Sequence, residues 1–295
     1  AEAEVLKRQA EKRTHAVSIL LVERQGQHVG VFFDQHPDIF DSYNAVLAAT
    51  EYSLVTTKAA RNVIKRRAKF LSLPLSTNNG QSMLTFDFLK MDVKKSKLTA
   101  EVIMKYLKSS SRIQIKTDAG TDLTLMKRGR MPGFFNGVTA DGGGFSSASI
   151  EVYIPVEECG TNGTMVIDGS LGYIGAARED TRVVFKEGRI VEIEETPTGK
   201  RLKEYMEGYH DSGIYVAGEL GIGLNSYSQC AGRCYIEDES AYGTFHIGLG
   251  RNIALGGTHE ANGHFDLVAK EPNLFADNRQ LIQQGRIIIP EPVFF

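Results

Sequence analysis

The pattern of apolar residues changes near residue 108, and this change limits the folds that the chain can adopt. Before it, residues 15–23 (HAVSILLVE) and 28–34 (HVGVFFD) resemble short strands, whereas residues 43–70 have the longer apolar period of helices. After it, short β-rich segments alternate with turn residues. We therefore predict a mixed α+β fold, with an N-terminal α/β domain over 1–108 and a β-rich metal-binding domain over 109–295.

Local patterns predict two hairpins and two helices near and after this boundary. Each hairpin consists of two alternating segments joined by a short turn that contains glycine. The helix next to the boundary has apolar residues on neighbouring turns and ends in a run of serines. The hairpins are expected over 112–127 and 181–195, and the helices over 97–111 and 198–209.

The composition indicates an ordinary globular protein. Hydrophobic residues make up 42% and charged residues 24% of the 295 residues, and the net charge is -2. This charge gives no field that would attract nucleic acid or an anionic membrane, and the apolar runs are too short to cross a bilayer. Three cysteines favour a reducing compartment. We expect a cytoplasmic protein with no nucleic-acid or membrane partner.

Two histidine-containing segments could supply metal ligands. A strand at 264–268 (HFDLV) would place His264 and Asp266 on one face, because side chains two apart in a strand point the same way. This pattern alone is weak, since a surface strand is the simpler reading. In residues 243–252 (GTFHIGLGRN), His246 would point away from its apolar neighbours, beside glycines that allow close approach. Together the segments offer three ligands.

Two glutamates extend this set. Glu219 is the one charged residue in AGELGIGLN (217–225), and a carboxylate buried there needs a cation or strong hydrogen-bond donors. Glu151 in SIEVYIPVE (149–157) lies in a similar alternating segment. Such oxygen and imidazole donors suit Zn²⁺, Co²⁺ or Mn²⁺. Five ligands can hold two metals if one carboxylate bridges them, an arrangement typical of hydrolases that activate water.

An ordered series of motifs resembles the aminopeptidase T family of thermophilic-type metallo-aminopeptidases. The series covers about residues 109–268 and consists of AGTDLTL, EVYIPVEECGTNGTMVIDG, ELGIGLN, DESAYGTFHIGLGRN and HFD. The resemblance implies an N-terminal α/β domain, a β-rich metal domain and a homodimer. It also implies a two-metal site with a bridging Glu219 and the ligands Glu151, Glu219, His246, His264 and Asp266.

This resemblance leads to the main functional expectation, which is a metallohydrolase that removes N-terminal residues from short peptides. A metal-activated water would attack the peptide, and a metal-held carboxylate, Glu219 or Glu151, would carry the proton. The family peptidases have a tyrosine seven residues after the histidine that matches His246, and this chain has Ile253 there. Arg251, Tyr242 or Tyr227 could replace its phenol as the oxyanion donor.

The departure at Ile253 keeps two alternatives open. The same superfamily includes enzymes that resemble 2,5-dihydroxypyridine 5,6-dioxygenase, in which one Fe(II) lies on two histidines and an aspartate. His246, His264 and Asp266 could form such a triad. The hydrolase is preferred here because both glutamates are present, which a single-iron oxygenase would not need. A binding protein that retains the fold without catalysis is the second alternative.

Overall fold

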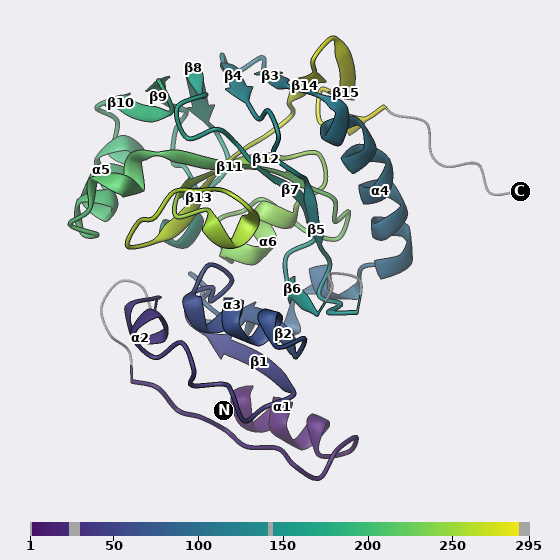
Figure 1. Ribbon diagram of the computed structural model, residues 1–295. Coiled ribbons are helices and arrows are strands. Elements are labelled where there is room, and N and C mark those ends of the chain that lie inside the picture. Colours follow the sequence, from purple (N-terminus) through teal and green to yellow (C-terminus); the bar gives the residue numbers. More distant parts are fainter. Residues whose placement is uncertain (1, 24–29, 141–143, 289–295) are drawn as a thin grey trace, which may run out of the picture.

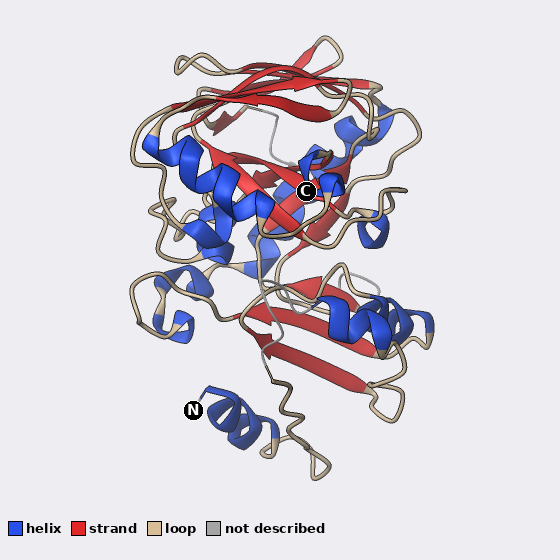
Figure 2. Ribbon diagram, turned by 90° about the vertical axis from the view of Figure 1, so that its left-hand side faces the viewer, coloured by secondary structure: helices blue, strands red, loops and turns tan. Residues whose placement is uncertain are grey.

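The chain forms two units, one above the other (Figure 1; Figure 2). A computed structural model describes residues 2–23, 30–140 and 144–288. The smaller unit contains a three-stranded parallel sheet, and the larger unit contains an eight-stranded and a five-stranded antiparallel sheet. The mixed α/β fold class expected from the sequence is confirmed.

The smaller unit is built around β1 (Ala45–Thr50), β2 (Lys69–Pro74) and β6 (Phe145–Ser147), in that spatial order. The connection from β1 to β2 contains α3 (Lys58–Lys65), as parallel strands require a crossover. One face of α3 is fully buried and shares a core with Phe70 of β2. The unit also includes α1 (Glu2–Ala10) and α2 (Gly30–Gln35).

The secondary structure expected before residue 71 was largely wrong. Residues 15–23 form no regular element, and Gly30–Gln35 is a helix where a strand was expected; residues 28 and 29 lie outside the described residues. Residues 43–70, expected to be helical, contain a strand, a helix and the start of a second strand. Short apolar runs such as AVLAAT fit a buried parallel strand as well as a helix, so their period does not discriminate between the two.

The larger unit is a sandwich of two antiparallel sheets (Figure 2). The outer sheet has the order β10-β9-β8-β4-β3-β14-β15-β16, and the inner sheet has the order β13-β12-β11-β7-β5. The outer strands are β3 (Arg112–Lys116), β4 (Asp122–Met126), β8 (Asn162–Ile167), β9 (Thr181–Lys186), β10 (Arg189–Ile193), β14 (Asn273–Ala276), β15 (Arg279–Gln283) and β16 (Arg286–Ile287). The inner strands are β5 (Gly133–Phe135), β7 (Glu151–Pro155), β11 (Ala217–Gly223), β12 (Phe245–Gly250) and β13 (His264–Ala269).

Three helices and five 3-10 turns complete the larger unit and its connection to the smaller one. The helices are α4 (Val93–Ser109), α5 (Pro197–Glu207) and α6 (Tyr235–Ser240). The turns are η1 (Met83–Thr85), η2 (Asp87–Lys90), η3 (Gly172–Ile174), η4 (Ser212–Tyr215) and η5 (Ile253–Leu255). Both predicted hairpins are confirmed as the pairs β3/β4 and β9/β10, and both predicted helices as α4 and α5.

The main core lies between the two sheets. Alternate residues of β11 and β12, such as Leu220, Ile222 and Ile247, point into it and meet apolar residues of the outer sheet, such as Ile115 and Leu123. Because side chains alternate along a strand, the intervening residues of the inner sheet point the other way, toward the smaller unit (Figure 1). The inner sheet therefore has one apolar face and one face available for polar side chains.

The domain boundary expected at 108/109 stays a prediction. The boundary falls in the last turn of α4, whose residues share the main core with β7. The later strand β6 pairs with β2 of the smaller unit. The chain therefore passes between the two units more than once. No helix within residues 2–23, 30–140 or 144–288 is long and apolar enough to cross a membrane.

Candidate metal centre

The five side chains expected as metal ligands lie on one face of the inner sheet. They come from four strands, and each one lies opposite a glycine of a neighbouring strand in the sheet register. The pairs are Glu151–Gly223, Glu219–Gly248, His246–Gly221, His264–Gly250 and Asp266–Gly248. The structure thus brings all five predicted residues together.

The glycines provide the space that these side chains occupy. A Cβ atom at Gly221 would overlap the imidazole of His246. A Cβ atom at Gly248 would lie 2.8 Å from Cε1 of His264 and 2.9 Å from Oδ1 of Asp266, closer than real Cβ contacts. Only glycine fits at these positions, because any side chain would compete with the imidazoles and carboxylates for the same volume.

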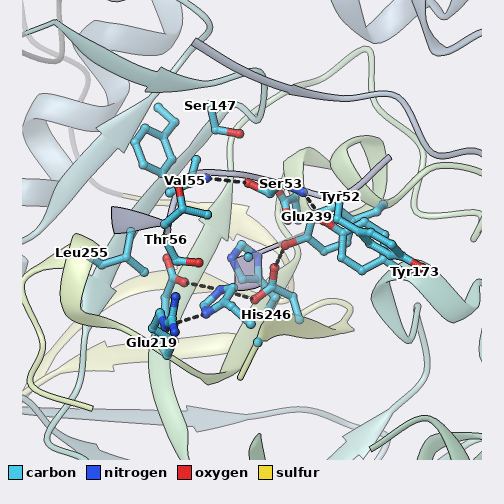
Figure 3. Close-up of a pocket in the computed structure, with 18 of the residues that line it drawn as sticks. Tyr52, Ser53, Val55, Thr56, Ser147, Tyr173, Glu219, Glu239, His246 and Leu255 are labelled. Atoms are coloured by element: carbon cyan, nitrogen blue, oxygen red, sulfur yellow. Dashed lines mark hydrogen bonds and ion pairs between the residues drawn. The ribbon is translucent and has the colours of Figure 1, made fainter. Parts of the chain in front are cut away.

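The side chains form two overlapping groups that share Glu219. Nε2 of His246 lies 2.9 Å from Oε2 of Glu151, and Nε2 of His264 lies 3.1 Å from Oε2 of Glu219 and 3.4 Å from Oδ1 of Asp266. In each group, Glu151/Glu219/His246 and Glu219/His264/Asp266, one donor atom per residue lies within 4.8 Å of the others. Figure 3 shows Glu219 and His246 on the floor of the pocket.

The electrostatics of the cluster favour a cation. Burial opposes the charged form of His246, but the carboxylates of Glu151 and Asp266 outweigh it and raise its pKa to about 9. The pKa of His264 is raised well above its usual range, because Asp266 and Glu219 likewise outweigh burial. Burial would raise the pKa of Asp266, yet the two histidines hold it well below its usual range. Burial raises the pKa of Glu219.

The donor atoms fit a divalent metal. Nδ1 of His246 is buried and has no hydrogen-bond partner among the described residues. The buried Oε2 of Glu151 and Oδ1 of Asp266 accept no hydrogen bond there either and face only the imidazoles of His246 and His264, at 2.9 and 3.4 Å. Nδ1 of His264 lies 2.8 Å from the carbonyl oxygen of Arg251, so an N–H there leaves Nε2 as the nitrogen that can bind a metal. Buried polar atoms without partners are costly, and a bound cation would satisfy them.

Several functional neighbours were not predicted from the sequence. The hydroxyl of Tyr235 donates to Oδ2 of Asp266, and the hydroxyl of Ser149 donates to Oε1 of Glu151 at 2.7 Å. Burial, together with the charges of Glu151 and Asp266, raises the pKa of Glu239 well above its usual range. Glu239 belongs to the acidic run of α6, which resembles a solvated surface in sequence but is fully buried. Its position inside the DESAYG motif was the available signal.

A segment of the smaller unit forms the roof of the pocket above these residues. Residues 52, 53 and 55–57, from the connection between β1 and α3, line it opposite the carboxylates and histidines (Figure 3). Aromatic side chains form much of the wall, and they are Tyr52, Phe135, Tyr173, Tyr209 and Tyr235. The pocket therefore combines a polar floor with flat apolar walls, as small-molecule sites commonly do.

The position of the missing tyrosine is occupied by Ile253, the first residue of η5. Of the three groups expected as substitutes, Arg251 lines the pocket, whereas Tyr227 and Tyr242 are not among its lining residues and are 51% and 44% exposed. The guanidinium of Arg251 is paired with Asp34, and its Nε lies 3.3 Å from Oε2 of Glu260. Arg251, the arginine among the described residues that line the pocket, is therefore already paired with carboxylates.

Comparisons with known proteins point to oxygenases. A sequence profile of the family described as 2,5-dihydroxypyridine 5,6-dioxygenase matches residues 82–289. The chain is 24% identical over 214 residues to the 2,5-dihydroxypyridine 5,6-dioxygenase of Pseudomonas putida, covering 68% of this chain. It spans 60% of the length of that relative.

Two solved structures have similar folds. The 2,5-dihydroxypyridine dioxygenase from Pseudomonas putida superposes with a TM-score of 0.73 at 18% identity, over 87% of this chain and 75% of the other. AmpT from Thermus thermophilus superposes with a TM-score of 0.52, also at 18% identity, over 66% and 55%. The resemblance to aminopeptidase T is therefore a shared fold.

The expectation of a peptide-cleaving metallohydrolase was wrong. The family profile and the curated relative both point to the dioxygenase that the sequence had left as an alternative. The motifs that suggested a peptidase lie in strands of both sheets, including the four strands that carry the five metal-site side chains. Their order follows a fold that this chain and AmpT have in common. The departure from the peptidases at Ile253 agrees with this outcome, and both glutamates are present in a chain that matches the dioxygenase profile.

Proposed function

Because the chain belongs to the 2,5-dihydroxypyridine 5,6-dioxygenase family, we propose that it is an Fe(II)-dependent dioxygenase that opens a hydroxylated pyridine ring. The observation that carries this proposal is that His246, His264 and Asp266 line one pocket with aromatic walls, in two donor groups that share Glu219. Two histidines and one carboxylate are the ligand set of many non-haem Fe(II) oxygenases.

His246, His264 and Asp266 would hold the iron. Asp266 suits this role because its negative charge interacts with both histidines, which keep it ionised. Bound Fe(II) supplies the one-electron chemistry that lets dioxygen react with a closed-shell ring. In the overall reaction, both oxygen atoms enter the product and the C5–C6 bond of the ring breaks. Electrons balance without an external reductant.

Glu219 would act as a general acid–base group in this reaction. Burial raises its pKa, so the carboxyl group can hold a proton inside the pocket and exchange it with a ring hydroxyl. Its Oε2 lies 3.1 Å from His264, which places it beside the proposed iron ligands. Glu151 is oriented by Ser149, whose hydroxyl donates to Oε1. These roles give both glutamates a purpose with a single metal.

The aromatic walls support a planar substrate. Tyr52 and Tyr173 meet edge to face with ring centroids 4.8 Å apart, and they lie on one side of the pocket, with Leu255 on the other (Figure 3). A flat ring can be held between such surfaces by stacking and apolar contact. The roof from the smaller unit limits the access of water to the floor.

Oxygen consumption tests this proposal. Protein loaded with Fe(II) without oxygen is mixed with aerated dihydroxypyridines, including the 2,5 isomer, in an oxygen electrode. We expect equimolar consumption of oxygen and ring, and we expect it to disappear in His264→Ala together with bound iron. His210→Asn is the matched control, because His210 is exposed and has a φ of 49° that asparagine tolerates. Iron-loaded protein that consumes no oxygen with any of these rings would contradict the proposal.

A further inference from the structure

We propose that Tyr235 is a positioning residue that orients the carboxylate of Asp266 toward the metal. This inference rests on the proposed function, because it assumes that Asp266 is a metal ligand. Tyr235 is the first residue of α6, which packs against β11 and β13. Its side chain is 5% exposed, and its hydroxyl donates a hydrogen bond to Oδ2 of Asp266.

The hydrogen bond distinguishes the two oxygens of Asp266. Oδ2 is occupied by the Tyr235 hydroxyl, whereas Oδ1 is buried without a hydrogen-bond partner among the described residues. Oδ1 is also the oxygen that faces Nε2 of His264, at 3.4 Å. A carboxylate held by one oxygen presents the other in a defined direction. In many metal sites, residues that hydrogen-bond to a metal ligand orient that ligand in this way.

The ring of Tyr235 is itself fixed from two sides. It stacks on Tyr173, with ring centroids 4.1 Å apart and an interplanar angle of 22°. A Cβ atom at Gly172 would lie 3.3 Å from Cδ2 of Tyr235 and 2.9 Å from the backbone oxygen of Asp266, so η3 packs closely against both residues. A side chain packed in this way has little rotamer freedom, and its hydroxyl stays on Asp266.

Tyr173 connects Tyr235 to the roof of the pocket. Its hydroxyl accepts a hydrogen bond of 2.9 Å from the backbone N–H of Ser53, which belongs to the roof segment. The roof, the two stacked rings and Asp266 thus form one continuous set of contacts. Placement of the metal carboxylate depends on residues of both units of the chain.

Metal titration of Tyr235→Phe tests the inference with a readout that does not depend on turnover. The variant keeps the ring and its stacking but removes the donor to Oδ2. Metal-free protein is titrated with Co²⁺, whose visible absorption reports its ligands, and then with Fe²⁺ without oxygen. We expect the affinity for both metals to fall by about 10–100-fold, as when other residues that hydrogen-bond to a metal ligand are removed. We also expect the Co²⁺ absorption bands to shift.

Two further variants make the result specific. Tyr106→Phe removes a hydroxyl far from the site, on α4, where the ring packs under Arg279, and it should leave Co²⁺ binding unchanged. Tyr173→Leu keeps the Tyr235 hydroxyl but removes the stacking, and it should weaken Co²⁺ binding by a smaller factor.

The outcomes separate this inference from the proposed function. Wild-type affinity and unchanged absorption bands in Tyr235→Phe would overturn the positioning role, while metal binding by the wild type would still support the dioxygenase. If the wild type binds neither Co²⁺ nor Fe²⁺, the proposed function fails first, and the inference fails with it.

Discussion

Four glycines of the inner sheet, at positions 221, 223, 248 and 250, lie opposite the five metal-site side chains. A glycine inside a strand costs roughly 0.5–1 kcal/mol relative to alanine, because the unfolded chain loses more freedom. Here that cost is offset by the room it gives to buried imidazoles and carboxylates. The alternation of glycine and ligand residues is therefore the residue-scale basis of the site.

Gly221→Ala tests this explanation. The added methyl group would overlap the imidazole of His246, so we expect the ring to be displaced and the affinity for Co²⁺ to fall at least about tenfold, the scale of an altered metal ligand environment. Ile222→Val is the matched control on the opposite face of the same strand, expected to cost about 0.5–1.5 kcal/mol of stability and to leave Co²⁺ binding unchanged. Equal Co²⁺ affinities in the two variants would contradict the account.

The burial of Asp238 leads us to expect that the free energy of unfolding depends on pH. Burial raises its pKa from 3.8 to about 6. Between these values the folded state binds more protons than the unfolded state. Protonated Asp238 therefore contributes fully to the free energy of unfolding below about pH 4, and this contribution is lost as the pH rises through about 6. The loss is on the order of 3 kcal/mol at 1.36 kcal/mol per pKa unit.

Urea unfolding of the wild type and Asp238→Asn at several pH values measures this effect. Asparagine keeps an oxygen for the backbone N–H groups of Ala231 and Gly232, each 2.9 Å from Oδ1 of Asp238. We expect the stability of the wild type relative to the variant to fall between about pH 4 and 6 and to be constant above that range. A difference independent of pH would show that Asp238 titrates normally.

At the scale of elements, α2 is tied to the loop after β12 through Arg251. Its guanidinium pairs with Asp34 of α2, and its backbone oxygen contacts Nδ1 of His264 at 2.8 Å. Asp34 also accepts a hydrogen bond from the backbone N–H of Lys58 at the start of α3. The smaller unit is therefore fixed beside the floor of the site by a contact between residues 217 positions apart.

Removing either carboxylate partner of Arg251 tests the importance of this contact. The Asp34 side chain is 12% exposed and the Glu260 side chain 56% exposed. Asp34→Asn should cost about 1–3 kcal/mol, because it leaves a largely buried guanidinium without its main partner. Glu260→Gln should cost about 0–1 kcal/mol, as exposed pairs do. Thermal unfolding of the two variants measures the difference, and equal losses would refute a special role for Asp34.

Elements with a clear local signal were the ones that the sequence predicted. The β3/β4 and β9/β10 hairpins have alternating strands and short turns, and α4 and α5 have amphipathic periods. The elements before residue 71 lack such signals, because β1 and β2 are short and partly buried in a parallel sheet. The pairing of β6 with β2 joins distant parts of the sequence, and no local pattern reports it.

At the scale of the whole molecule, the ligand face was predictable and the chemistry was not. Glu219, His246, His264 and Asp266 share a face because of the register of three neighbouring strands. The sequence itself shows this only for His264 and Asp266, which are two residues apart in one strand. The roof that carries Tyr52 and Ser53, and the support of Asp266 by Tyr235, depend on tertiary contacts. The homodimer expected from the resemblance stays a prediction that light scattering can measure.

The central claim is that this pocket inserts both atoms of dioxygen into a hydroxylated pyridine ring. The most direct measurement is mass spectrometry of the product formed by Fe(II)-loaded protein under isotopically labelled dioxygen, with samples taken before the product exchanges oxygen with water. The account predicts two labelled oxygen atoms in one ring-opened product. A product that carries one labelled atom, or label only when the water is labelled, would contradict it.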